Sequence, residues 1–265
     1  MTIRVGIGGW NYEPWRRNFY PEDLVQKLEL HYASRQVTAI EVNATYYGTQ
    51  KPASFARWRD ESPDDFVFSL KASRYATNRR VLAEAGDSID RFLNSGIVEL
   101  GRKLGPLVWQ FAPTKRFEPD DFEAFLRQLP GKLAGVVLRH VVEVRHESFM
   151  CPEFIALARK YRTTAVHTDS PEFPSFADRT GEVVYARLMN AQSRFTDGYA
   201  PKALDRWAEI ARTWAEGKAP QDLPQLVPPK AGDGRAPGDV FIYFINGAKE
   251  RAPAAAQALL KRLRS

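Results

Sequence analysis

The regular alternation of strand-like and helix-like segments constrains the fold of this chain more than any other feature. Eight apolar, β-branched runs have the length of strands: Ile3–Gly9, Ala39–Tyr47, Phe66–Ser73, Pro106–Ala112, Val141–His146, Thr163–Asp169, Glu182–Met189 and Asp239–Asn246. Helix-period segments lie between most of these runs and after the last one: Glu22–Ser34, Pro52–Asp60, Asp87–Lys103, Pro119–Leu129, Pro152–Tyr161, Pro201–Glu216 and Arg251–Leu263. Strands that alternate with helices favour parallel βαβ units. Eight such units in 265 residues predict an α/β fold, the closed TIM (βα)8 barrel.

Two segments depart from this alternation. Ser170–Gly181, between the sixth and seventh strand-like runs, is short and contains proline, so we expect the crossover helix there to be missing or reduced. Residues 218–238 are rich in Pro and Gly and predict an irregular insertion before the last strand, either a surface loop or a partner-binding loop. We expect residues 1–265 to form a single domain.

Composition excludes several classes of protein. A hydrophobic fraction of 44% excludes a disordered chain, and the single cysteine, Cys151, excludes an internal disulfide framework or a multi-cysteine zinc site. The first residues lack the pattern of a signal peptide, and no apolar run approaches the ~18 residues that span a membrane. We therefore predict a cytoplasmic protein without a membrane association. The net charge of +6 permits an anionic ligand or nucleic acid.

Polar residues on the predicted strands indicate where a site would lie. Alternate residues of a barrel strand face the interior, and we expect the polar set of each strand to do so. This rule places twelve polar residues inside: Glu41, Asn43, Thr45, Ser69, Lys71, Ser73, Gln110, Glu143, Arg145, His167, Asp169 and Arg187. On the sixth strand it turns Val166 toward the helices. Gly6 and Gly8 on the first strand leave room at the mouth of the barrel.

The charged members of this set suggest the chemistry. Three carboxylates face three cations: Glu41, Glu143 and Asp169 against Lys71, Arg145 and Arg187. Buried charges require partners, so these residues either form an ion-pair plug or take part in a ligand site. Most lie near the C-terminal ends of strands, where TIM barrels place their active sites. The cations would hold a phosphate or carboxylate, and Glu41, Glu143 or Asp169 would act as acid or base.

Metal and nucleophile chemistry have weaker support. Only His146 and His167 fall near the predicted mouth, which argues against a histidine-rich metal centre and leaves a single divalent cation as the alternative use of the carboxylates. We predict no cofactor. His146 has the opposite parity to Arg145 and would pack beside a helix or cap a loop. Cys151 precedes a proline at a helix start and is interpreted as a small packing residue.

The first loop after a strand, Trp10–Pro21, is rich in aromatic residues and arginine. Such residues can stack on a base or a sugar, or they can pack as a lid. Arg74–Arg80 and Asn190–Tyr199 follow the third and seventh strands and fall on the same face. A basic, aromatic rim of this kind is compatible with a phosphorylated ligand and also with nucleic acid.

Several motifs resemble those of the YecE-like family, the domain of unknown function 72. They are Val5-Gly6-Ile7-Gly8-Gly9-Trp10-Asn11-Tyr12, Glu41-Val42-Asn43-Ala44-Thr45-Tyr46-Tyr47, Phe68-Ser69-Leu70-Lys71-Ala72, Gln110-Phe111-Ala112-Pro113, Glu143-Val144-Arg145-His146-Glu147-Ser148, Tyr185-Ala186-Arg187-Leu188 and Tyr243-Phe244-Ile245-Asn246. The resemblance implies a TIM barrel and implies no activity.

The sequence departs from the usual pattern of that family at three places. Asn78 stands where the family tends to have His, Met189-Asn190 where His-Gly is usual, and Gly247 where Asp is usual. Each change removes a titratable or metal-capable group. The departures indicate a narrower site or the loss of part of an ancestral chemistry, and they weaken the metal hypothesis.

Together these observations predict an enzyme, or a degenerate enzyme, that binds a small anionic ligand at the barrel mouth and acts as a hydrolase, lyase or isomerase. The predicted catalytic residues are Glu41, Glu143 and Asp169. The predicted ligand-binding residues are Trp10, Tyr12, Asn43, Tyr46, Lys71, Gln110, Arg145, His146, Arg187 and Asn246. Two alternatives are a nucleic-acid-binding or phosphodiester-cleaving barrel, and a non-catalytic binding protein whose inner charges are structural.

Overall fold

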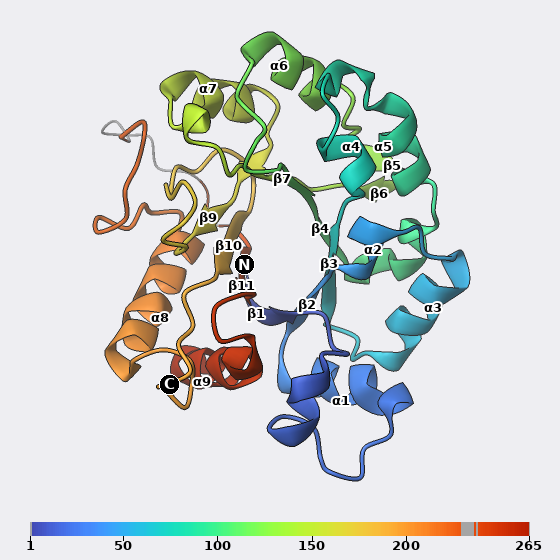
Figure 1. Cartoon of the computed structure of the whole chain (residues 1–265), viewed down its shortest axis with the longest axis vertical. Coiled ribbons are helices and arrows are strands. Elements are labelled where there is room, and N and C mark those ends of the chain that lie inside the picture. Colours follow the sequence, from blue (N-terminus) through green and yellow to red (C-terminus); the bar gives the residue numbers. More distant parts are fainter. Residues whose placement is uncertain (1, 229–235, 237, 265) are drawn as a thin grey trace.

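A parallel sheet forms the centre of the molecule, as seen in a computed structural model that describes residues 2–228, 236 and 238–264 (Figure 1). Within these residues the sheet has nine strands: β1 (Ile3–Gly8), β2 (Ala39–Val42), β3 (Val67–Lys71), β4 (Leu104–Gln110), β7 (His140–Glu143), β8 (Thr164–Ala165), β9 (His167–Thr168), β10 (Val184–Leu188) and β11 (Val240–Phe244). Two further strands, β5 (Lys132–Leu133) and β6 (Val136–Val137), form a separate antiparallel hairpin.

The sixth predicted strand closes the sheet into a barrel. The order of the strands is β8-β7-β4-β3-β2-β1-β11-β10-β9, so β8 and β9 are its two ends. Only Val166 separates β8 from β9 along the chain, and its N–H donates to the carbonyl of Val142 at 2.9 Å. One continuous segment therefore pairs with β7 through its first half and with β10 through its second. The predicted TIM barrel is confirmed.

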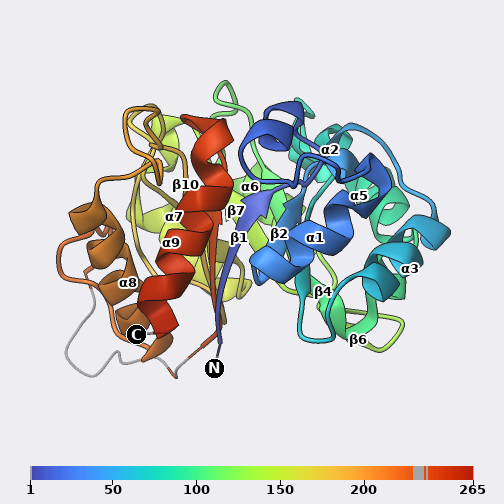
Figure 2. The same cartoon turned by 90° about the horizontal axis from the view of Figure 1, so that it is seen from below.

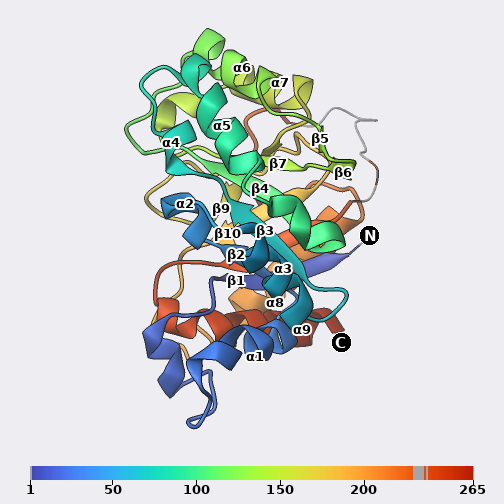
Figure 3. The same ribbon diagram turned by 90° about the vertical axis from the view of Figure 1, so that its right-hand side faces the viewer.

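Helices surround the sheet, as Figures 1 and 3 show. They are α1 (Glu29–Gln36), α2 (Ala44–Tyr47), α3 (Pro52–Glu61), α4 (Arg74–Thr77), α5 (Gly86–Leu93), α6 (Pro119–Arg127), α7 (Pro152–Lys160), α8 (Pro201–Ala215) and α9 (Ala252–Arg264). Short 3₁₀ turns are η1 (Glu13–Arg17), η2 (Gln26–Leu28), η3 (Leu82–Glu84), η4 (Ile97–Lys103), η5 (Glu147–Phe149) and η6 (Lys249–Arg251). Figure 2 shows α8 and α9 packed side by side. Four helices begin with proline, whose fixed φ suits the first helical position: α3, α6, α7 and α8.

The two irregular segments behave differently. Residues 169–183, all of which the structure describes, contain no helix, so the predicted loss of the sixth crossover helix is confirmed. Of the predicted insertion at 218–238, residues 229–235 and 237 lie outside the described part. The described residues 218–228 form neither helix nor strand. No helix in the described ranges is both long enough and apolar enough to cross a lipid bilayer.

Side-chain alternation divides the apolar core into two layers. The inner layer fills the barrel and includes Val108, Val141, Tyr185 and Phe241. The outer layer lies between the strands and the helices and is larger. Val5, Ile40, Leu70 and Val142 belong to it, which leaves their polar neighbours on these strands facing inward as predicted.

The predicted orientation of the sixth strand is wrong. Val166 belongs to the inner layer, whereas the ring of His167 packs in the helix layer against Trp207 and Trp214 of α8. Burial lowers the pKa of His167 to about 4, so its imidazole is neutral, and Nδ1 lies 2.9 Å from the carbonyl of Phe176. A neutral, hydrogen-bonded histidine fits an apolar layer, so polarity alone did not report which side of the strand faces inward.

Several predicted strands end earlier than expected, and the difference is largest at β2 and β7. β2 ends at Val42, and the chain enters the short helix α2 one residue later. Thr45 and Tyr46 therefore project from a helix and not from the barrel wall. β7 ends at Glu143, so Arg145 and His146 belong to the following loop.

The barrel requires glycine at position 6 because two elements meet there. A Cβ on Gly6 would lie 2.1 Å from the carbonyl oxygen of Ala39 and 2.8 Å from the ring of Tyr243. The first contact is with backbone and cannot be relieved by a rotamer change. We predict that Gly6→Ala lowers the free energy of unfolding by roughly 3 kcal/mol or more. Urea denaturation checks this, with Gly131→Ala as the control.

The control position is open, because a Cβ on Gly131 would meet nothing within 4 Å. Gly131→Ala should therefore change the free energy of unfolding by no more than about 0.5 kcal/mol. Equal stability of the two variants would show that the close approach at Gly6 is not required.

Candidate functional site

A buried arginine joins two carboxylates across the barrel mouth. Arg187, on β10, donates from Nε and Nη2 to the two oxygens of Glu41 on β2 at 3.0 and 2.9 Å. Its Nη1 donates to Oε2 of Glu143 on β7. These side chains are at most 3% exposed. The guanidinium therefore ties together three strands that are not neighbours in the sheet.

Further donors complete this network. The hydroxyl of Tyr185 donates to Oε2 of Glu41 at 2.8 Å, and Nε2 of Gln110 donates to Oε2 of Glu143 at 2.7 Å. Arg145 donates from Nε to Oε1 of Glu143 at 2.8 Å. Burial alone would raise the pKa of Glu143, but Arg187 and Arg145 outweigh it and hold that pKa below its usual value. Glu143 is therefore ionised and fully hydrogen-bonded.

Lys71 is the exception in this charged layer. It is the last residue of β3 and is only 7% exposed. Its ammonium lies 3.9 Å from the centroid of the Tyr46 ring and has neither an ion pair nor a hydrogen-bond acceptor among the described residues. Burial and then the positive charge of Arg187 lower its pKa from the usual 10.5 to about 8. Lys71 is thus a cation with an aromatic neighbour and no carboxylate of its own.

Asp169 does not belong to the network. It accepts a hydrogen bond from the N–H of Met189 at 2.5 Å and another from the hydroxyl of Tyr199 at 2.8 Å. These contacts connect the ends of β9 and β10 with the loop before α8. The expected balance of three carboxylates and three cations at the mouth is therefore wrong. Two carboxylates, Glu41 and Glu143, face three cations.

The remaining predicted ligand-binding residues lie at the edge of the mouth. Asn43 directly follows β2, and its Nδ2 would lie 3.3 Å from a Cβ on Gly8. Asn246 follows β11 and is exposed. Trp10 packs edge-on against Trp58 of α3, at 5.2 Å between ring centroids. These contacts give Trp10 a packing role beside the mouth.

The loop after β1 is folded against neighbouring elements. Tyr12 packs edge-on against Trp15, which is fully buried and donates from its indole nitrogen to the carbonyl of Lys249 at 3.0 Å. The ammonium of Lys249 lies 4.4 Å from the centroid of the Tyr12 ring. Most aromatic rings of this loop are therefore already packed and do not offer a free stacking surface.

His146 caps a loop, which is one of its two predicted roles. Its Nδ1 accepts the N–H of Ser148 at 3.1 Å and lies 2.8 Å from the Ser148 hydroxyl, at the start of η5. Cys151 is a free, half-buried thiol directly before α7. Within the described ranges, no three His, Cys, Asp or Glu side chains gather in an arrangement that could hold a metal ion.

Sequence reasoning missed three members of the inner mouth. Tyr185 precedes Arg187 by two residues, so strand alternation alone would have placed it inside. The hydroxyl of Tyr243 lies 2.7 Å from the hydroxyl of Ser69 across the barrel, and the mostly apolar eighth strand carries no polar alternation that would report its orientation. Phe173 stacks on the guanidinium of Arg145 at 4.3 Å. It comes from the irregular segment after β9, where no periodicity reports orientation.

Comparisons with known proteins agree with this architecture. A family profile described as "Protein of unknown function DUF72" matches residues 4–265. The protein YecE of Escherichia coli K12 is 28% identical over 164 residues, which cover 61% of this chain and 53% of YecE. YunF of Bacillus subtilis 168 is 24% identical over 157 residues, covering 57% of this chain and 54% of YunF. The matched region thus spans about half the length of these curated relatives.

Solved structures show the same fold. A DUF72 family protein from Thermotoga maritima MSB8 superposes with a TM-score of 0.75 at 22% identity, over all of both chains. One from Enterococcus faecalis V583 gives a TM-score of 0.72 at 16% identity, over all of this chain and 96% of the other. SacUVDE superposes with a TM-score of 0.57 at 10% identity, over 99% of this chain and 98% of the other. At these identities the likeness concerns the fold alone.

The Arg187 bridge predicts a large stability effect. Arg187→Met leaves two buried carboxylates without their shared partner, so the free energy of unfolding should fall by about 3–5 kcal/mol. Adding Glu41→Gln and Glu143→Gln to that variant should recover part of the loss, because the unpaired charges are gone. Urea denaturation at pH 7 measures both.

The matched control is the surface pair of Arg206 and Asp222, whose side chains are 54% and 51% exposed. Arg206→Met should cost no more than about 1 kcal/mol. If Arg187→Met costs as little as the surface variant, the bridge does not hold the barrel mouth together.

Lys71 predicts a pH-dependent stability. Its pKa is lower in the folded chain than in the unfolded chain, so its burial opposes folding below about pH 8. That opposition disappears as pH rises from 8 to 10.5, where the unfolded chain also loses the proton. Lys71→Met should therefore be more stable than the wild type at pH 7 by up to roughly 3 kcal/mol, at 1.36 kcal/mol per pKa unit.

The measurement is urea denaturation of both proteins at pH 7 and near pH 10. The stability difference should shrink toward zero at the higher pH. Lys132→Met, at an exposed position in the β5–β6 hairpin, should show no such pH-dependent difference. If the difference in unfolding free energy between Lys71→Met and the wild type stays constant between the two pH values, the pKa of Lys71 is not lowered.

Proposed function

The chain belongs to the DUF72 family of proteins of unknown function, and from its site we propose that it binds a small anionic ligand at the barrel mouth, beside Lys71. The single observation that carries this proposal is the buried ammonium of Lys71, which has no carboxylate partner. An uncompensated buried cation is costly unless a ligand or water supplies the opposite charge. A phosphorylated or carboxylated small molecule would do so.

The charges around Lys71 favour an anionic ligand over a cationic one. Glu41 and Glu143 are each bound by Arg187, and Glu143 also by Arg145. Neither carboxylate is free to pair with Lys71, so the mouth carries a net positive charge. Arg145 is 17% exposed and lies at the edge of this layer, where its guanidinium can reach a second ligand oxygen.

Acid and base roles differ from those expected from sequence. Glu41 and Glu143 are engaged in ion pairs, which suits them to hold Arg187 in place. Lys71, with a pKa of about 8, is the group at the mouth that can exchange a proton near neutral pH. We assign it the acid and base role in any reaction at this site, with Arg145 and Asn43 orienting the ligand.

A nucleic acid is the second candidate ligand. Tyr47 and Tyr75 are 64% and 61% exposed, and the Arg74 guanidinium lies 5.9 and 5.5 Å from their ring centroids. Exposed aromatic rings beside an arginine are a common platform for single-stranded bases. This candidate predicts oligonucleotide binding that weakens steeply as salt is raised.

The main proposal is tested by a thermal-shift screen of phosphorylated and carboxylated metabolites at pH 7. A specific ligand at about 100 times its Kd should stabilise the wild type by about 2.7 kcal/mol. Lys71→Met should abolish the shift, whereas the control Lys132→Met should retain it. For the wild type, affinity should fall about tenfold per pH unit above pH 8, because Lys71 loses its charge there.

Two results would overturn the proposal. One is a ligand that stabilises Lys71→Met as much as the wild type. The other is the absence of any small-molecule shift together with salt-sensitive binding of a single-stranded oligonucleotide, which would favour the second candidate.

A further inference from the structure

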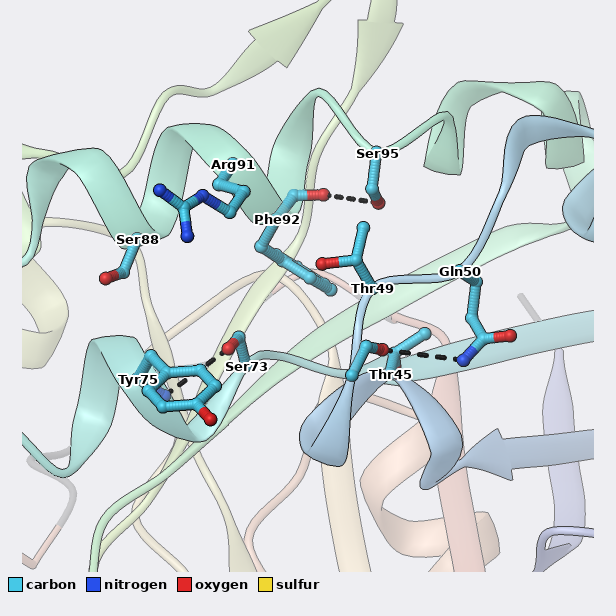
Figure 4. A pocket seen from close by; sticks show the side chains of 10 residues that line it. Thr45, Thr49, Gln50, Ser73, Tyr75, Ser88, Arg91, Phe92 and Ser95 are labelled. Carbon is cyan, nitrogen blue, oxygen red and sulfur yellow. Dashed lines mark hydrogen bonds between the residues drawn. The ribbon is translucent and has the colours of Figure 1, made fainter.

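A cavity opens beside the barrel mouth, between α2, α4 and α5 (Figure 4). Its empty space is about 490 Å³, a figure that includes solvent at its opening. Six of its ten lining residues carry hydroxyl groups: Thr45, Thr49, Ser73, Tyr75, Ser88 and Ser95. The lining also contains Arg91 and includes no carboxylate. This composition differs from that of the mouth, where Glu41 and Glu143 lie among the cations.

Two of these hydroxyl groups, those of Ser73 and Ser88, retain an O–H that could donate to a ligand. Ser95 donates to the carbonyl of Phe92, and Thr45 donates to that of Lys71, so these two are engaged. The oxygen of Ser73 accepts the N–H of Tyr75 at 3.3 Å, and that of Ser88 accepts from Arg79 at 3.2 Å. Both serines act as acceptors there, and their O–H groups have no acceptor among the described residues.

The guanidinium of Arg91 is the main charge of the cavity. It has neither a hydrogen bond nor an ion pair among the described residues. In Figure 4 Arg91 and Ser88 extend from α5 toward Ser73 and Tyr75 at the start of α4, and the hydroxyl of Thr49 points into the same space. A positive charge and several O–H donors from three elements therefore converge.

A second guanidinium adjoins this group. Arg79 donates to Ser88, while its Nε is buried without a hydrogen-bond partner among the described residues. Arg74, at the start of α4, lies over the ring of Tyr75. Arg74 and Arg79, which follow the third predicted strand, thus each contact a residue that lines the cavity, and the Lys71 site does not use them.

We propose that this cavity binds the phosphoryl group of a small phosphorylated molecule. Donors that converge from several directions, together with a guanidinium, match the oxygens of a tetrahedral anion. The absence of a lining carboxylate removes the repulsion that such an anion would otherwise meet. The proposal does not depend on the Lys71 site, because the residues that would contact the phosphoryl group are different.

The experiment is a titration of the isotope-labelled full chain with inorganic phosphate at pH 7, followed by amide NMR. The amides of Thr49, Ser73 and Ser88 report on the cavity, and those of Gly8 and Asn43 report on the barrel mouth. We expect saturable shifts at the cavity amides. Arg91→Gln should weaken that binding at least tenfold, equivalent to about 1.4 kcal/mol.

Two controls separate the possibilities. Arg102→Gln removes an exposed arginine that pairs with Asp64 away from the cavity, and it should bind phosphate as the wild type does. Lys71→Met should leave the cavity shifts intact. Ser88→Ala should weaken phosphate binding while its fold, judged from the other amides, stays unchanged.

Three results would overturn the proposal. One is binding of phosphate by Arg91→Gln with unchanged affinity, and another is that Lys71→Met abolishes every saturable shift. The latter result would leave the mouth site standing and remove this one. The third is binding of a single-stranded oligonucleotide without binding of phosphate, which would identify nucleic acid as the ligand in place of a small phosphorylated molecule.

Discussion

The bridge from Arg187 to Glu41 and Glu143 is the interaction on which the rest of the mouth depends. A buried guanidinium needs acceptors for several N–H groups at once, and these two carboxylates supply them from opposite sides. The bridge fixes β2, β7 and β10 relative to each other, and Tyr185 and Gln110 add hydrogen bonds to the same oxygens. Because both carboxylates are occupied by this arginine, Lys71 is left as the uncompensated cation.

This distribution of partners also determines which groups can react. A carboxylate that accepts several charge-assisted hydrogen bonds is a weak base, because protonation would break them. Glu143 is such a group, and its function is to hold Arg187 and Arg145. The Lys71 ammonium lies over the face of Tyr46, and burial together with the charge of Arg187 outweighs the attraction of Glu41 and Glu143, so its pKa falls to about 8. Lys71 is therefore the reactive group of the proposed site, because the Arg187 network leaves it without an ion pair among the residues that the structure describes.

Much of this arrangement could be predicted from the sequence. The alternation of strands and helices identified the barrel, and polar residues at strand ends identified Glu41, Lys71, Glu143 and Arg187 as inward. The sixth strand is the exception, because there the polar side chain does not face inward. His167 is polar but neutral and hydrogen-bonded, so it can occupy the helix layer.

Other features gave no sequence signal. Asp169 has the charge of a catalytic residue, yet Tyr199 and Met189 occupy its oxygens, and those contacts join segments far apart in the chain. The hydroxyls of the cavity come from α2, α4, α5 and the residues beside them, and the periodicity of each segment does not report that these elements meet. The helix α2 connects the Lys71 site with the cavity: Tyr46 lies against the Lys71 ammonium, while Thr45 lines the cavity and donates to the carbonyl of Lys71 at 2.7 Å. Any displacement of α2 therefore alters both sites.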